Sequence, residues 1–301
     1  MTGRAAHIAR THNAGARAGV ARCAPAPQPA LGEWPASGPA DRMLLLNTAA
    51  YPTLLRYRHA QLGRLCVPGC TSHIAETLAL TKVGFDNGCY HGLDPAAVCR
   101  MYEQIAGWPS MGARVAKAYG PILAGGRDPR LGFGGALPDI HPNLLWCTVP
   151  DVVRCSCGRE THCRPRERTR GCAPVGDARR TLERFAVWHP FLAHLPLAYV
   201  LQDGCERPGL IPWDAPALTA VFVGGSDRWR YGEACANLVR EARRRGLLAH
   251  FGRISSLSKI RYIHSIGATS FDSSRYSRWR DITLGAGLAA ASQPAQLRLV
   301  D

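Results

Sequence analysis

Three aspartates in this chain follow directly on short apolar runs, at positions where β-strands would end. Asp86 closes KVGFD, Asp151 follows LLWCTVP, and Asp272 closes ATSFD. One aspartate after a strand is ordinary, because aspartate favours turns and helix caps. Several carboxylates at one edge of a sheet offer more, because one can act as a nucleophile while another transfers a proton.

Other strand ends carry groups that suit a flat, hydrogen-bonding ligand. Asn87 and Tyr90 lie in FDNGCY, just after the first of these aspartates. Gln202 closes LAYVLQ, and Gly224 and Gly225 follow AVFV. A tyrosine ring can stack on a base, whereas an amide and open backbone N–H groups can bond to its edge. The alternatives are that Tyr90 simply packs the rim of a barrel and that Asp151 is a plain helix cap.

The elements that must position these groups alternate between short apolar runs and amphipathic helical stretches. The predicted strands are 43–48, 64–69 (the weakest), 82–86, 144–150, 197–202, 220–224, 247–252 and 268–272. Helices are predicted over 94–107, 177–192, 232–246 and 256–267. The first has Asp94 as its N-cap and Pro95 at its first position, and the last two end in glycine.

Apolar runs that alternate with helices indicate parallel strands, and about eight such units are typical of an α/β TIM (β/α)8 barrel. A doubly wound open sheet is the alternative, but no G-x-G-x-x-G turn follows the first run. In a TIM barrel the active site lies at the C-terminal ends of the strands, where the polar groups above occur. His250 ends an apolar run and is interpreted as a core histidine.

The charge of the chain favours a polyanionic partner. Its 37 Lys+Arg against 22 Asp+Glu give a formal net charge of +15, and nearly all the cations are arginine. A GC-rich genome would explain arginine in place of lysine, but not the excess over acids. No apolar run approaches the ~20 residues that cross a bilayer, and no export signal is evident, so we expect a protein of the bacterial or phage-infected host cytoplasm.

The N-terminal 42 residues are rich in Ala, Gly, Pro and Arg and have few large apolar side chains. They are predicted to be a flexible basic tail, with the barrel domain over 43–290 and a C-terminal tail over 291–301.

Four motifs resemble, in order, those of the tRNA-guanine transglycosylases. FDNGCY is similar to that family's D-S-G-G-Y motif, VLQDG to V-Q-G-G, FVGGS to the G-G-L turn, and SFDSS to F-D-C. The resemblance covers residues 43–285. It implies a TIM barrel that exchanges a base in a nucleic acid without a required cofactor. It makes Asp272 the covalent nucleophile and Asp86 the acid/base catalyst.

The resemblance also implies a purine pocket, in which Tyr90 stacks on the base and Asp151 and Gln202 read its edge. The backbone N–H near Gly225 would contact the base, with Asn87 and Gly224 beside it. Breaking an N-glycosidic bond passes through an oxocarbenium-like state, which an anion below the sugar stabilises. The target base must be flipped out or single-stranded.

The end of the chain favours DNA over tRNA as the substrate. The tRNA enzymes carry a C-x-C-x-x-C…H zinc site and a helical subdomain after the nucleophile, whereas the residues after Asp272 contain no Cys or His. The chain looks more like the phage and bacterial 7-deazaguanine DNA transglycosylases, which exchange guanine in DNA for a base such as preQ0. Action on tRNA and an inactive barrel that only binds nucleic acid are the alternatives.

Two further segments carry predictions. The cluster after Asp272 is expected to hold nucleic-acid phosphates and bases, unless it is an ordinary solvated face; its members are Arg275, Tyr276, Arg278, Trp279 and Arg280. The segment 154–175 is predicted to be an insert that either binds zinc or is a disordered basic loop. Its possible ligands are Cys155, Cys157, Cys163 and Cys172, with His162 available.

Overall fold

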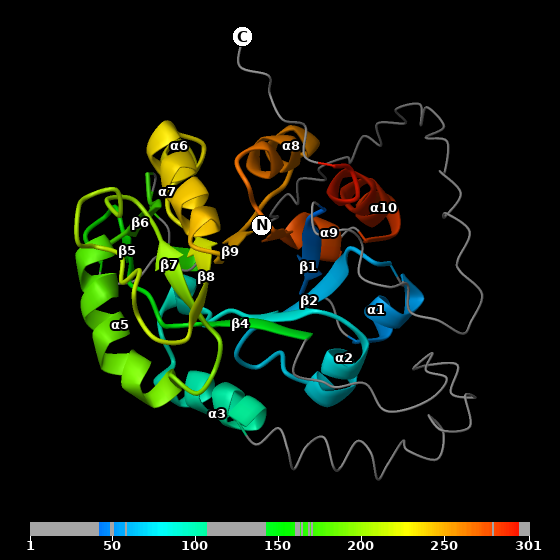
Figure 1. Ribbon diagram of the computed structural model, residues 1–301, viewed down its shortest axis with the longest axis horizontal. Helices are drawn as coiled ribbons and strands as arrows, with labels where there is room; N and C mark the ends of the chain where they lie inside the picture. The colour runs from blue at the N-terminus through cyan, green and yellow to red at the C-terminus, as the bar shows by residue number, and fades with distance from the viewer. Residues whose placement is uncertain are drawn as a thin grey trace, which may run out of the picture.

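A computed structural model describes residues 42–48, 51–57, 59–106, 143–159, 163, 165–167, 169, 171–278 and 280–294. Eight parallel strands form a closed barrel in the order β1-β10-β9-β8-β7-β4-β3-β2 (Figure 1). The predicted TIM (β/α)8 barrel is therefore confirmed. The barrel strands are β1 (Leu44–Asn47), β2 (Leu62–Cys66), β3 (Val83–Phe85), β4 (Leu144–Thr148), β7 (Leu197–Leu201), β8 (Leu218–Val223), β9 (Leu248–Phe251) and β10 (Ser270–Asp272).

All eight predicted runs supply a barrel strand, including the weakest one, which becomes β2. Helices surround the barrel in Figure 1. In the described residues they are α1 (Tyr51–Arg56), α2 (Ile74–Leu80), α3 (Pro95–Ala106), α5 (Ala178–Leu192), α6 (Asp227–Arg230), α7 (Glu233–Arg244), α8 (Leu257–Ser265), α9 (Ser274–Arg278) and α10 (Arg280–Ala291), with 3-10 turns η1 (Cys89–His91) and η3 (Pro165–Glu167). None of these helices is long and apolar enough to cross a bilayer.

The helix ends follow the local sequence. The carboxylate of Asp94 accepts a hydrogen bond from the Ala97 N–H at 3.0 Å, which caps α3 as predicted. The Asp177 carboxylate accepts from the Arg180 N–H at 3.1 Å and caps α5 in the same way. After α7 and α8 the chain turns at Gly246 (φ 78°) and Gly267 (φ 102°), a left-handed backbone that glycine adopts without strain.

Side chains alternate between two cores, because successive residues of a strand point to opposite faces. Inside the barrel, Leu46, Leu65, Trp146, Ala198 and Ala220 pack together. The intervening residues face the surrounding helices and form the larger outer core. The predicted runs are apolar throughout because parallel barrel strands are buried on both faces.

The two ends of the predicted barrel domain meet. The N–H of Met43, just before β1, donates to the carbonyl of Ala291 at the end of α10, at 3.1 Å. Helix α10 thus runs one residue past the predicted boundary at 290. The predicted flexible tail, apart from Arg42, and residues 295–301 of the predicted C-terminal tail lie outside the described residues.

The predicted insert follows β4. It contains a two-stranded antiparallel sheet of β5 (Val153–Cys155) and β6 (Pro174–Gly176), in which Cys155 lies opposite Pro174. Strand β6 leads directly into α5. The segment is therefore framed by regular structure at both ends, and its Gly176 lies against Gln202, which directly follows β7.

Candidate active site

A cavity of about 200 Å³ opens at the C-terminal ends of the strands. This is below the ~300–1,000 Å³ of drug-sized pockets and suits a small flat ligand. All eight residues predicted for catalysis and base binding line it. The lining residues are Asp86, Asn87, Cys89, Tyr90, Asp151, Val153, Pro174, Gly176, Val200, Gln202, Phe222, Gly224, Gly225, Gly252, Arg253 and Asp272.

The period-two pattern of the strands brings these residues together. On β10, Ser270 and Asp272 share the inner face, and Phe271 between them packs outward against Tyr276 with ring centroids 6.3 Å apart. The floor of the cavity is aromatic. Phe222 lines it and stands edge-on to Trp146, with ring centroids 5.6 Å apart and planes at 88°. The polar residues at the strand ends therefore form a ring above a barrel interior that is mostly apolar, with His250 and Ser270 as its buried polar pair.

The environment of Asp86 gives its carboxyl a pKa that suits proton transfer near neutral pH. It is partly buried at the cavity wall, and the pKa of its carboxyl is raised from 3.8 to about 7. Desolvation is the largest cause, and the negative charges of Asp151 and Asp272 add to it. The Gly88 N–H donates to Asp86 Oδ1 at 3.4 Å and partly opposes the rise. A carboxyl with such a pKa can both donate and accept a proton at physiological pH.

Asp272 is held in a single orientation. The backbone N–H of Arg253 donates to its Oδ1 at 3.2 Å, and His250 Nε2 lies 3.1 Å from its Oδ2. When Asp272 is a carboxylate, which only accepts, Nε2 donates to it and Nδ1 accepts from the Ser270 hydroxyl at 2.9 Å. The imidazole is fully buried and packs against the rings of both Trp146 and Phe222, with its centroid 4.8 Å from each. His250 is therefore a core histidine, as interpreted, but one that positions the carboxylate.

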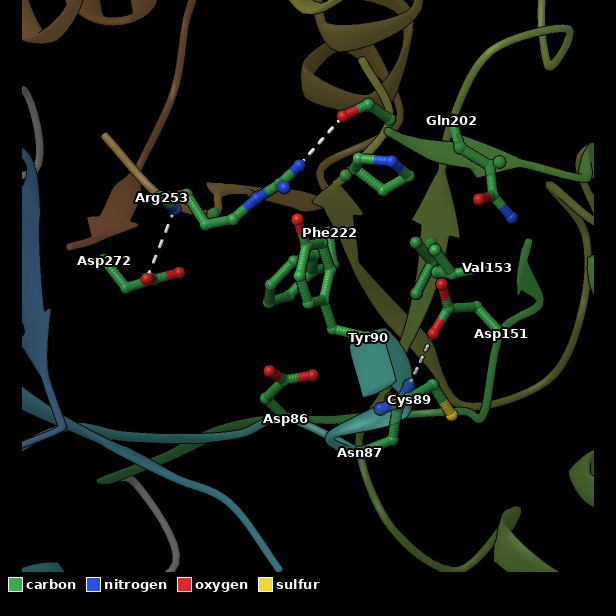
Figure 2. A pocket seen from close by; sticks show the side chains of 16 residues that line it. Asp86, Asn87, Cys89, Tyr90, Asp151, Val153, Gln202, Phe222, Arg253 and Asp272 are labelled. Atoms are coloured by element: carbon green, nitrogen blue, oxygen red, sulfur yellow. Dashed lines mark hydrogen bonds between the residues drawn. The ribbon is translucent and has the colours of Figure 1, made fainter. Parts of the chain in front are cut away.

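Asp151 is buried just before β5, the first strand of the insert, and desolvation raises the pKa of its carboxyl. Asn87 orients it: Nδ2 of Asn87 donates to Asp151 Oδ1 at 3.1 Å (Figure 2). The same Nδ2 donates to the Val149 carbonyl, also at 3.1 Å. The Asn87 Oδ1 accepts from the Cys89 N–H at 2.8 Å. Both amide hydrogens of Asn87 are thus bonded within the protein. Asn87 lines the cavity, but its side chain serves Asp151 rather than pointing free hydrogens at a ligand.

Gln202 stands against the insert. Its Nε2 donates to the hydroxyl of Thr181 in the first turn of α5, and that hydroxyl also accepts from the Val152 N–H at 3.0 Å. A Cβ atom on Gly176 would lie only 2.3 Å from Gln202 Oε1, so β6 can approach this closely only because residue 176 is glycine. The end of β7, the start of α5 and the insert are therefore one packed unit.

Arg253 crosses the cavity mouth and was not predicted as a site residue. Its guanidinium lies over the ring of Tyr90, 4.9 Å from the centroid, and its Nη2 donates to the Gly225 carbonyl at 2.8 Å (Figure 2). Its backbone has φ 62°, unusual for a residue with a side chain. The buried Arg230 supports this turn by donating to the Gly252 carbonyl. The only sequence signal is an arginine directly after the predicted strand 247–252, whose last residue is glycine.

The turn after β8 is held by Asp203, a residue that follows β7. Gly225 has φ 74°, and a Cβ there would meet Asp203 Oδ2 at 2.7 Å. That oxygen accepts from the Ser226 N–H at 2.7 Å, and Asp203 Oδ1 accepts from the Ser226 hydroxyl at 2.5 Å. The carboxylate of Asp203 thus holds the Gly224–Gly225 turn against the cavity.

The predicted nucleic-acid cluster is only partly at the surface. Arg275 and Arg278 are exposed on α9. The prediction for Tyr276 is wrong: its side chain is only 2% exposed and packs on Phe271 under α10, because α9 is a helix that buries one face. Trp279 and the side chain of Arg280 lie outside the described residues.

The four predicted zinc ligands come together. The Sγ atoms of Cys155, Cys157, Cys163 and Cys172 all lie within 4.8 Å of one another, so these residues could hold a metal ion. The ordered β5–β6 frame argues against a fully disordered loop. His162 lies outside the described residues.

Comparisons with known proteins add little to this picture. No family model and no curated protein matches the chain. One solved structure that resembles it is an HpcH/HpaI aldolase from Desulfitobacterium hafniense, with 16% identity, 85% of this chain and 95% of that chain covered, and a TM-score of 0.34.

Proposed function

We propose that the protein is a base-exchange glycosyltransferase, which replaces guanine in DNA with a 7-deazaguanine such as preQ0. The observation that carries the proposal is that Asp86 and Asp272 line one cavity in two different environments. Asp86 is a carboxyl with a pKa of about 7, whereas Asp272 is bonded at both oxygens and faces the cavity as an acceptor. Such a pair divides the roles of acid and nucleophile.

In the proposed reaction an Asp272 oxygen attacks C1′ of the sugar as the bond from C1′ to the guanine nitrogen breaks. The electron pair of that bond goes to the guanine, and Asp86 donates a proton to the departing base. The deazaguanine then enters and loses a proton to Asp86. Its nitrogen attacks C1′, and Asp272 leaves as a carboxylate. The two aspartates thus return to their starting states, and the exchange consumes no cofactor.

The remaining groups would position the reactants. The hydrogen bonds from His250 and the Arg253 N–H keep the Asp272 carboxylate turned toward the cavity. Asp151 Oδ1 already bonds to Asn87, and the carboxylate can also accept from the N–H groups on a purine edge. Tyr90 would stack on the base, with Arg253 moving off its ring as the ligand enters. A net charge of +15 suits a nucleic-acid substrate.

The direct test incubates the full chain with a guanine-containing oligonucleotide and preQ0, and analyses the nucleosides by mass spectrometry. We expect the deazaguanine nucleoside in DNA with the wild-type protein and none with Asp272→Asn. Asp214→Asn is the matched control, because Asp214 is an exposed carboxylate that pairs with Arg245 outside the cavity. Parallel samples contain single-stranded DNA, duplex DNA and tRNA.

Each outcome separates the candidate functions. Exchange in tRNA but not in DNA would replace the proposed substrate and keep the chemistry. Tight binding of DNA without exchange or a covalent adduct would favour a binding protein. Exchange by Asp272→Asn would refute the assigned nucleophile.

A further inference from the structure

The insert after β4 has almost nothing apolar to hold it in place. Residues 154–172 contain no Val, Ile, Leu, Met, Phe, Tyr or Trp. Strands β5 and β6 have three residues each, and a two-stranded sheet of this kind is at best marginally stable in water. Nevertheless Cys155 and Cys163 are only 3% and 2% exposed. A segment this polar needs another source of cohesion to bury two thiols.

The spacing of the four sulfurs fits a single tetrahedral ion. With a zinc–sulfur distance of ~2.3 Å, the ligands of a regular tetrahedron stand ~3.8 Å apart. The Sγ of Cys163 lies 3.5 Å from that of Cys157 and 3.9 Å from that of Cys172, and all four sulfurs lie within 4.8 Å of one another. These distances are too long for disulfides, and all four cysteines are free.

The backbone turns the cysteines toward a common centre. The Gly158 N–H donates to the Cys155 carbonyl at 2.9 Å, and φ of 92° at Gly158 completes a tight turn. On the other side the Cys172 N–H donates to the Thr169 carbonyl at 3.1 Å. The hydroxyl of Ser156 ties the two sides together, because it accepts from the Ala173 N–H and donates to the Gly171 carbonyl, both at 2.9 Å.

The surrounding charge suits an anionic metal centre. Four thiolates around a zinc ion carry two net negative charges, and residues 154–172 contain six arginines against two glutamates. Arg154 and Arg159 already pair with Asp177 and Glu167, and an anionic centre would offset part of the remaining repulsion among the arginines.

We propose that the four cysteines bind one zinc ion, and that this ion holds the β5–β6 insert as a wall of the cavity. Three residues of the insert line the cavity: Val153 on β5, and Pro174 and Gly176 on β6. Cys155 ends β5 and Cys172 lies two residues before β6, so the ion would fix both strands. Through Gly176 and Gln202 the zinc would set the width of the pocket on this side.

The first experiment measures metal content in the purified full-length protein. We expect one zinc per chain, strong loss in Cys157→Ser and Cys163→Ser, and full retention in Cys99→Ser, because Cys99 is an exposed cysteine on α3 outside the cluster. Replacement of the zinc by cobalt should give the absorption of a tetrahedral thiolate site. Protein without bound zinc, stoichiometric iron in its place, or equal loss in all three variants would overturn the proposal.

The second experiment tests whether zinc keeps β5 and β6 folded as a wall of the cavity. It uses the wild-type chain, so that misfolding of a variant does not decide the result. Zinc is removed with a chelator and then restored with zinc chloride, and hydrogen exchange is followed at each step. We expect at least a tenfold faster exchange in β5, β6 and the first turn of α5 without zinc, unchanged exchange in β1 and β10, and recovery on re-addition. Unchanged exchange in β5 and β6 would refute the structural role.

A third measurement links the ion to the proposed function, on which this step rests. Guanine binding should weaken at least tenfold when zinc is removed and recover when it returns. Equal guanine affinity with and without zinc would refute the link between ion and pocket. If the zinc-loaded protein binds no guanine, the proposed function fails, whereas the zinc site stands on the first two experiments.

Discussion

Replacing Asp86 with asparagine should stabilise the protein at neutral and alkaline pH, but not in acid. The carboxyl of Asp86 has its pKa raised from 3.8 to about 7. The folded protein therefore holds this proton more tightly than the unfolded chain does, and the free energy of unfolding falls as the pH rises from about 4 to about 7. The penalty is fully present above pH 7 and absent below pH 4.

The size of the effect follows from the two pKa values. One pH unit of difference corresponds to about 1.4 kcal/mol, so the full penalty is about 4 kcal/mol. Because Asp86 faces an open cavity, solvent lowers this figure, and we expect about 2–4 kcal/mol. Asparagine retains an oxygen that can accept from the Gly88 N–H, so the variant removes the charge and keeps the local hydrogen bond. In a domain of this size the melting temperature should rise on the order of 10 °C at pH 8.

The assay is thermal unfolding of both proteins from pH 5 to pH 8.5, followed by circular dichroism. The difference in melting temperature should grow steadily with pH up to about 7 and then level off. Asp214→Asn, which removes an exposed carboxylate, is the control and should show a much smaller slope. A difference that is the same at pH 5 and pH 8.5, or a variant that is less stable at pH 8, would refute the reasoning.

Three other substitutions test separate parts of the site. Asp272→Asn should abolish both base exchange and the covalent DNA adduct seen on a denaturing gel, while filter binding shows DNA affinity retained; an adduct in this variant would place the nucleophile elsewhere. Tyr90→Ala should weaken guanine binding by ~1–3 kcal/mol, the contribution of a stacking ring, as measured by calorimetry. Gly176→Ala should lower the free energy of unfolding, measured by chemical denaturation, by ~1–3 kcal/mol, because the new methyl group would lie 2.3 Å from Gln202 Oε1. The control is Gly285→Ala in helix α10, where a Cβ meets no atom within 4 Å, and this change should leave the free energy of unfolding unchanged or raise it.

The barrel could be predicted because its strands are apolar on both faces, a pattern that does not depend on distant contacts. The residues at the strand ends could be predicted for the same reason, since a closed parallel barrel brings every strand end to one rim. Even the weak run that becomes β2 was recognisable, although it includes the buried Arg64.

What escaped prediction depends on contacts between segments far apart in sequence. The role of His250 follows from its register with Ser270 on the neighbouring strand, which no local pattern reveals. The sequence around Tyr276 predicts a basic, aromatic surface, but helix α9 directs the Tyr276 side chain onto Phe271. The cysteines have no standard finger spacing, and they converge because β5 pairs with β6.

The alternation along β10 has a consequence for how this gene can change. Deleting Ser270 would turn Phe271 into the cavity and the aspartate out toward α9, so this single-codon deletion should be as damaging as losing the aspartate. The connection after β4 behaves differently, because it already accommodates an insert of some twenty residues without breaking the barrel. Insertions and deletions in related sequences should therefore occur in the loops between strands and helices. The strands themselves should vary in residue type but not in residue number.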